Sequence, residues 1–133
     1  MTLRFSGSGS IVAWGWGGLL AAALSLSAAD YYVATNATPG SPYNTWASAY
    51  TNLQEALDGA AEGDVIRLAG HVFSVTSEVV WTRSGVSLYG GYKATGASPG
   101  NRNPTQWVTV ITRPASGYGR LLNLTGVTNG VLE

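Results

Sequence analysis

The chain has 133 residues, with 7 basic and 7 acidic side chains and no cysteine. Its balanced charge and the lack of a basic block make nucleic acid and anionic membrane surfaces poor candidates as partners. Without cysteine, an exported domain of this size must be held together by backbone pairing and packing rather than by disulfides.

Residues 1–29 have the pattern of a secretory signal peptide. Arg4 supplies a positive charge, residues 11–26 form an uncharged apolar run, and residues 27–29 are small and suited to cleavage. A retained membrane anchor is the alternative, but the apolar run is short and is interrupted by glycines. The sequence therefore predicts a secreted or cell-surface protein that starts near Asp30 and has no membrane span after signal cleavage.

The next segment is predicted to contain a strand, a loop and a short helix. Residues 30–34 favour a strand, and prolines and a glycine mark residues 36–44 as a loop. Thr51 and Gln54 have the spacing of a helix capping box, and Gly63 is placed to end the helix in a left-handed turn. One apolar stripe would hold the helix against the strands, and it consists of Leu53, Ala56, Leu57 and Ala60.

From residue 65 onward, short segments alternate apolar and polar residues, so one face of each segment is apolar. Turn residues, glycine among them, stand at the corners between the segments. This pattern predicts short strands at residues 65–68, 78–81, 86–89, 108–111, 121–124 and 131–133.

These strands repeat with a common spacing, because the separation of Val65 and Val79 equals that of Val108 and Leu122. Three short strands per cycle are typical of a solenoid of parallel strands, whose open end a helix can cover. An antiparallel sandwich is the main alternative, and Asn129-Gly130 could form a hairpin turn. The last predicted strand reaches the final residue, so we expect further coils in a longer protein and self-association through the open end.

Residues 92–106 interrupt the cycle with a composition rich in Gly, Pro, Asn, Ser and Thr, which is typical of a surface loop. The predicted organisation is a signal peptide at 1–29, an N-terminal strand, loop and capping helix at 30–64, and incomplete first coils at 65–133, with a loop insertion at 92–106.

Five blocks of sequence stand in a characteristic order: 31–36 (YYVATN), 46–57 (WASAYTNLQEAL), 63–66 (GDVI), 86–92 (VSLYGGY) and 126–133 (GVTNGVLE). Together they resemble the start of secreted bacterial proteins with the right-handed parallel β-helix, or pectin-lyase-like, fold. The resemblance implies a mostly β chain with an N-terminal capping α-helix, as a fragment that lacks the later coils. Such proteins often carry a Gly- and Asp-containing turn after the first strand, whereas residues 36–40 hold no acid.

Relatives of this kind include polysaccharide lyases, glycoside hydrolases, cell-surface adhesins and exported passenger domains. The resemblance implies that the full-length protein binds or processes extracellular polysaccharide or a surface glycan, while this fragment is itself non-catalytic. Two alternatives stay open: an adhesin or passenger stalk, and a small stand-alone carbohydrate-binding module. No catalytic residue, cofactor or metal ligand can be assigned by matching, because the working acids and bases usually lie on later coils.

Aromatic residues are the leading candidates for contact with sugar. Tyr92 and Trp107 border the inserted loop, where an exposed ring could stack on a sugar face. Tyr89 and Tyr118 belong to the same set. Trp46 and Trp81 are expected to have packing roles, Trp46 seating the cap and Trp81 filling a corner.

Charged residues give weaker candidates. His71 is the only histidine, but the sequence shows neither an orienting partner nor a pocket for a general base. Asp58, Glu62 and Asp64 lie close enough in sequence to suggest calcium, although they lack the graded spacing of a calcium loop. An anionic groove is a further possibility, lined by Arg67, Arg83, Arg113 and Arg120.

Overall fold

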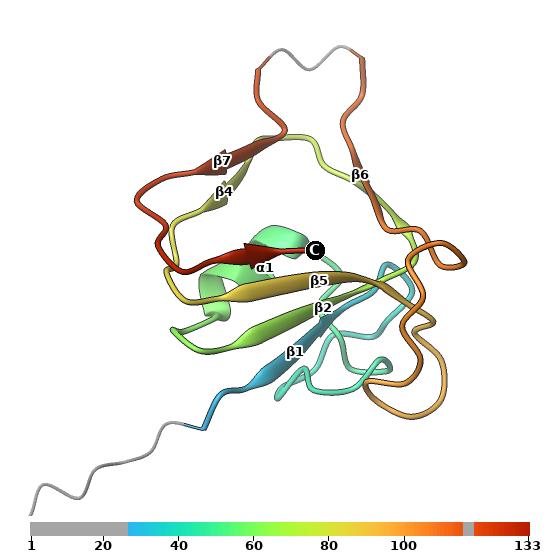
Figure 1. Ribbon diagram of the computed structural model, residues 1–133. Helices are drawn as coiled ribbons and strands as arrows, with labels where there is room; N and C mark the ends of the chain where they lie inside the picture. Colours follow the sequence, from blue (N-terminus) through green and yellow to red (C-terminus); the bar gives the residue numbers. More distant parts are fainter. Residues whose placement is uncertain (1–26, 116–118) are drawn as a thin grey trace, which may run out of the picture.

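The computed structural model describes residues 27–115 and 119–133, which form a mostly β structure with one short helix (Figure 1). Within these residues, no helix has the length and apolar character needed to cross a membrane. The predicted signal peptide lies almost entirely outside the described residues. The elements are β1 Asp30–Val33, α1 Leu53–Gly59, β2 Val65–Ala69, β3 Val72–Ser74, β4 Val79–Trp81, β5 Ser87–Tyr92, β6 Val110–Thr112, β7 Leu122–Leu124 and β8 Val131–Leu132.

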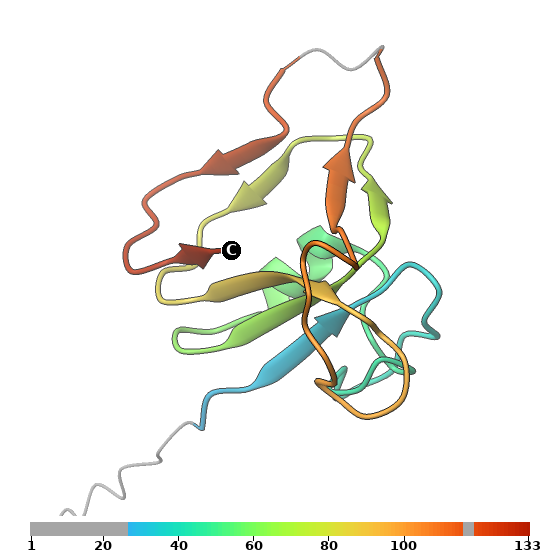
Figure 2. The same ribbon diagram turned by 45° about the vertical axis from the view of Figure 1, so that its right-hand side comes forward.

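The strands form three small sheets, and every pairing between named strands is parallel. Strands β2, β3 and β4 lie in three different sheets, and β5, β6 and β7 enter the same three sheets in the same order. The first sheet has the order β1-β2-β5-β8, while β3-β6 and β4-β7 form the other two. The sheets lie along three sides of a triangular outline in both views (Figures 1 and 2). Parallel pairing is therefore confirmed, and Asn129-Gly130 forms no hairpin, because β7 and β8 belong to different sheets.

The predicted repeat contains two correct pairings and one error. The segment that begins at Val86 pairs with the one at Val131, as β5 with β8. Val79 pairs with Leu122, as the equal spacing suggested. Val65, however, pairs with Ser87, and the strand that begins at Val110 pairs with Val72 of β3. The error arose because β3 is only three residues long and showed no alternation strong enough to predict it.

The cap region also departs from its prediction in detail. The residue before α1 is Asn52, whose side chain accepts a hydrogen bond from the Gln54 N–H at 2.8 Å, so the capping box with Thr51 is wrong. The helix ends at Gly59, so the prediction that Gly63 ends it is wrong. Gly63 does take a positive φ, of 92°, but in the later turn before β2. The apolar stripe is confirmed, since Leu53, Ala56, Leu57 and Ala60 are all buried.

Burial is uneven along the chain. In β2 and β5 the predicted alternation holds, because Ile66, Leu68 and Leu88 are buried in one core. The apolar residues of the later strands lie largely at the surface, because each of these strands has a neighbour on one side only in the part of the chain described. The exposed members are Val110, Leu124, Val131 and Leu132, and Val108 and Leu121 are exposed just before β6 and β7.

Two tryptophans have the packing roles expected of them. Trp81 is fully buried, and its indole N–H donates to the Arg83 carbonyl at 2.7 Å. Trp46 is buried against the edge of the Tyr32 ring, with ring centroids 4.6 Å apart. The indole N–H of Trp46 donates to the Pro99 carbonyl at 3.0 Å, so the loop after β5 folds back onto the N-terminal region.

Candidate functional site

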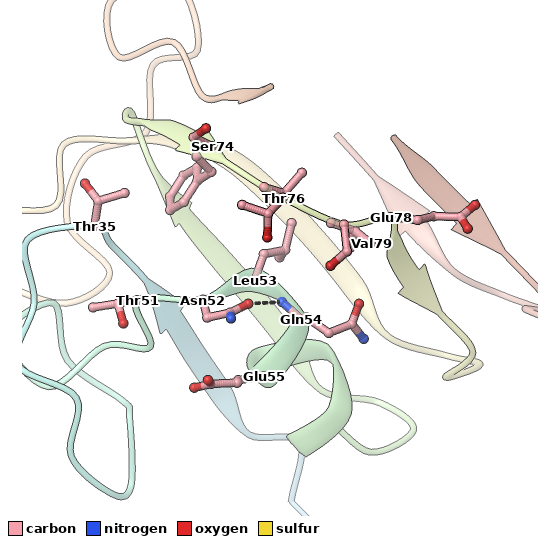
Figure 3. Close-up of a pocket in the computed structure, with 13 residues that line it drawn as sticks. Thr35, Thr51, Asn52, Leu53, Gln54, Glu55, Ser74, Thr76, Glu78 and Val79 are labelled. Carbon is pink, nitrogen blue, oxygen red and sulfur yellow. Dashed lines mark hydrogen bonds between the residues drawn. The ribbon is translucent and has the colours of Figure 1, made fainter. Parts of the chain in front are cut away.

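A polar cleft lies between the start of α1 and the segment that joins β3 to β4 (Figure 3). Its volume is about 490 Å³. Leu53, Phe73 and Val79 supply apolar surface, and the remaining wall is mostly polar. Five hydroxyl groups line it, from Thr35, Thr51, Ser74, Thr76 and Ser77.

The helix side of the cleft is fixed by two polar side chains. Asn52 holds the first turn of α1 through its bond to the Gln54 N–H (Figure 3). The Gln54 amide reaches β4, where its oxygen accepts the Val80 N–H at 2.7 Å and its nitrogen donates to the Val80 carbonyl at 2.9 Å. Gln54 therefore pairs with the edge of β4 in the way a neighbouring strand would.

The strand side of the cleft carries a free edge. The His71 carbonyl and the Val75 N–H bond to β6, so the backbone groups of alternate residues point to the opposite edge. Ser74 is such a residue, and it lines the cleft. In residues 27–115 and 119–133, β3 has no strand other than β6 beside it.

The cleft has hydrogen-bonding capacity that the described residues do not use among themselves. The hydroxyls of Thr51, Ser74, Thr76 and Ser77 form no hydrogen bond with any described residue. Glu55 and Glu78 are the charged residues of the lining, so the cleft favours a ligand that is neutral or positively charged. In the part of the chain described, no cluster of three His, Cys, Asp or Glu could hold a metal ion.

A cluster of three half-buried tyrosines lies beside the cap. The Tyr43 and Tyr50 rings stack with centroids 3.8 Å apart, and the edge of Tyr31 meets Tyr50 at 6.0 Å. Burial raises the pKa of Tyr50, and the neighbouring Tyr43, Tyr31 and Glu55 raise it further. The sequence does not mark this cluster, because the three residues are separated along the chain and meet only in the fold.

The two aromatic residues predicted to contact glycan lie in different surroundings. Tyr92 ends β5 and is only 5% exposed, so its ring offers little surface to a sugar. Arg67 donates to the Tyr92 hydroxyl at 2.6 Å, and the Trp46 ring packs 5.7 Å away. Trp107 is half-buried, and its backbone passes close to Gly70. Glycan contact at Tyr92 and Trp107 stays a prediction, with Trp107 the more accessible of the two.

The remaining aromatic candidates add no platform to the cleft. Tyr89 is half-buried and lies under the Arg102 guanidinium, whose central carbon is 5.4 Å from the ring centroid. Tyr118 lies outside the described residues.

His71 has a local structural partner. Its Nδ1 atom lies 3.3 Å from the Thr35 backbone nitrogen, which donates to it, and 3.1 Å from the Thr35 hydroxyl. These contacts join the end of β1 to the start of β3. No carboxylate in the described residues forms a hydrogen bond with the ring, so the structure supplies no orienting acid for a general base.

The acidic residues near α1 are engaged separately. Asp64 is 6% exposed, and its two carboxylate oxygens accept the Ala29 N–H at 2.7 Å and the Ala61 N–H at 2.8 Å. Asp58 accepts a hydrogen bond from the Gln54 amide at 2.9 Å, and Glu62 lies against the corner at Gly85. Asp64 thus has a structural role in joining the residue before β1 to the turn before β2.

The four arginines considered for an anionic groove do not line the cleft. Arg67 forms an ion pair with Asp30 at 3.0 Å in addition to its bond with Tyr92. Although burial lowers the pKa of Arg67, the Tyr92 hydroxyl and the Asp30 carboxylate raise it overall. Arg83 donates to the Asp58 carbonyl at 3.1 Å and Arg113 to the Arg120 carbonyl at 3.0 Å, so these guanidinium groups make local backbone contacts.

A scan against protein-family models and searches of curated proteins and of solved structures found no match.

Proposed function

We propose that the described residues are the N-terminal cap and first coils of a right-handed parallel β-helix. The strand order carries this proposal, because β2, β3 and β4 visit three sheets and β5, β6 and β7 return to them in the same order. The uniform parallel pairing fits a chain that winds in one rotational sense. A parallel stack of this kind is stable only if its first coil is covered.

Covering the first coil is the task we assign to β1, α1 and Gln54. Strand β1 pairs with the outer edge of β2, and Gln54 pairs with the outer edge of β4. The apolar face of α1, which includes Leu53 and Leu57, lies over the first turns of the core. This arrangement removes both unpaired backbone groups and exposed apolar side chains at one end of the stack.

The opposite end of the molecule is not covered by any described residue and exposes apolar surface. Strands β6, β7 and β8 each expose apolar side chains, and Leu132 is 57% exposed. An apolar hollow of about 320 Å³ lies there, with Leu68, Val108 and Ile111 in its lining. Further parallel strands, or a second copy of the chain, would bury this surface, so we propose that the chain self-associates when it is studied alone.

The biological setting we propose is extracellular. An exported β-helix protein that binds or processes polysaccharide, or a surface glycan, accounts for the leader-like residues 1–29 and for the tyrosine cluster of Tyr31, Tyr43 and Tyr50. Partly exposed tyrosine rings can bury the apolar face of a sugar while the hydroxyl stays hydrated. The 133 residues themselves are proposed to be non-catalytic.

Affinity electrophoresis and an activity assay test this function. The purified chain should be retarded in gels that contain an acidic polysaccharide such as pectin, and Tyr43→Ala should reduce the retardation at least threefold. Val72→Ala is the control, because Val72 is exposed on β3 and belongs to no aromatic cluster. Bond cleavage by the purified chain would contradict the non-catalytic assignment. If Tyr43→Ala and the parent chain are retarded equally, the tyrosine cluster does not bind the polysaccharide.

Two alternative functions lead to different expectations for the full-length protein. An adhesin or passenger stalk would carry many further coils and an anchoring or export segment after residue 133. A stand-alone carbohydrate-binding module would be a stable monomer that binds glycan without additional sequence. Extending the reading frame and measuring the mass in solution distinguish these cases.

A further inference from the structure

We propose that the polar cleft binds an extended, positively charged peptide segment of a partner protein, which adds to the free edge of β3 as a strand. This inference concerns the cap end of the molecule and does not depend on glycan binding. It rests on the unpaired edge of β3, on the backbone groups that point into the cleft and on the charge of the lining.

At the end of the molecule that carries β1 and α1, the outer edges of β2 and β4 are covered, and the outer edge of β3 is not covered by any described residue. The outer edge of β2 is paired with β1, and the outer edge of β4 is paired with the Gln54 amide. The corresponding edge of β3 faces the cleft, and no described residue pairs with it. An unpaired strand edge beside two covered ones is the arrangement into which an added strand fits.

The backbone alternation sets which groups would bind. Because His71 and Val75 direct their backbone groups toward β6, those of Ser74, which lies in β3 between them, face the cleft. An extended peptide can pair with them by main-chain hydrogen bonds, as in β-strand addition. The nearby hydroxyls of Thr35 and Thr51 offer further donors and acceptors on the opposite wall.

Charge and shape select the peptide. Glu55 and Glu78 are the charged side chains of the lining, so basic side chains on the peptide are favoured over acidic ones. The volume of about 490 Å³ is within the range of roughly 300–1,000 Å³ that is usual for ligand-sized pockets. The aromatic ring in the lining, Phe73, is 3% exposed, so the cleft lacks a stacking platform for sugar.

The test uses the 133-residue chain and a synthetic peptide, acetyl-Lys-Val-Thr-Val-Lys-amide. Nuclear magnetic resonance titration should show saturable shifts at Ser74 and Thr76, and exchange of the Ser74 amide proton should slow at least tenfold. An acidic peptide with Glu in place of Lys should bind at least tenfold more weakly. The double variant Glu55→Gln with Glu78→Gln should weaken the basic peptide about three- to tenfold.

A second variant tests the backbone contact itself. Ser74→Pro removes the N–H that faces the cleft while leaving the bonds to β6, and it should weaken the basic peptide at least tenfold; Ser74→Ala, which keeps the N–H, should bind as the parent does. The proposal is overturned if the amide of Ser74 stays unprotected, or if the acidic peptide binds equally well. It is also overturned if cellohexaose, but not the basic peptide, produces the shifts, because the cleft would then be a sugar site.

Discussion

The side-chain amide of Gln54 and the backbone of Val80 form two hydrogen bonds, with the Gln54 oxygen accepting at 2.7 Å and its nitrogen donating at 2.9 Å. A helix side chain thereby takes the place of a neighbouring strand. The same glutamine also donates to Asp58 at 2.9 Å, which holds the amide in one orientation along α1. This single residue links α1 to β4.

Replacing Gln54 by Ala should lower the free energy of unfolding by about 1–3 kcal/mol, because the part-buried N–H and carbonyl of Val80 lose their partner. Urea denaturation followed by circular dichroism measures the loss. Glu55→Ala is the matched control, since Glu55 is the next residue and is exposed. If Gln54→Ala loses no more stability than the control, Gln54 does not cover the edge of β4.

Gly70 should tolerate no side chain. A Cβ atom there would lie 2.5 Å from the Trp107 Cβ and 2.7 Å from its backbone carbonyl carbon, so Gly70→Ala must displace the chain that leads into β6. We expect a loss of about 1–3 kcal/mol in the free energy of unfolding. A Cβ atom at Gly40 would have its nearest neighbours 4.0 Å away, so Gly40→Ala should change stability little. Equal stability of the two variants would show that Trp107 does not pass over Gly70.

Asp64 should couple the residue before β1 to the fold. A chain that starts at Asp30 lacks the Ala29 N–H that donates to Asp64 at 2.7 Å and the Ala29 carbonyl that accepts from Val65 at 2.9 Å. It should be about 1–3 kcal/mol less stable to urea than a chain that starts at Ser27. Asp64→Asn should cost less in the shorter chain than in the longer one, because one partner is already gone. Additive losses would contradict the contact between Ala29 and Asp64.

Tyrosine ionisation should destabilise the fold at high pH. Burial raises the pKa of both Tyr32 and Tyr50 above the ordinary value of 10.0, so the folded state holds these protons more tightly than the unfolded state. The resulting stability is complete below pH 10 and is lost as pH rises through the folded pKa values. Melting temperature and absorbance at 295 nm, measured together above pH 10, check this. Tyr50→Phe should shrink the alkaline loss, and an equal loss in Tyr50→Phe and the parent chain would contradict the contribution of Tyr50.

The exposed apolar end should drive association of the isolated chain. Leu124 and Leu132 are 53% and 57% exposed, and both lie on strands with one paired edge. Leu124→Lys combined with Leu132→Lys should shift the weight-average mass in analytical ultracentrifugation toward the monomer. Val72→Lys is the control, since Val72 is 60% exposed but lies on β3 beside the cap. A parent chain that is monomeric at every concentration would contradict this.

The sequence located most elements, but it did not give all of their partners correctly. Alternation in the segments at Val65, Val86 and Leu122 predicted strands there, because side chains on successive strand residues point to opposite faces. It could not predict β3, whose three residues carry little pattern, and so it matched Val65 with the strand near Val108 instead of with Ser87. The two spacings are equal for different reasons. The step from Val65 to Val79 contains β3, whereas the step from Val108 to Leu122 contains a long connection between β6 and β7.

The site was less predictable than the fold. Thr35, Thr51 and Ser74 come from three separate segments, and none of them has a local motif that marks it as part of a cleft. The tyrosine cluster has the same origin. Conversely, Tyr92 looked accessible from its place beside a loop, but the ring is enclosed by Trp46 and Arg67.

By itself, the amino-acid sequence determined the periodic features: short parallel strands, one buried helix face and a polar loop after β5. These follow from the order of apolar and polar residues, which acts locally through the geometry of strands and helices. The tertiary structure alone decided which strand edges are covered and which are left free, because this depends on where distant segments meet. That is why Gln54 covers β4, why β3 is left open to the cleft, and why the apolar residues of the last strands lie at the surface.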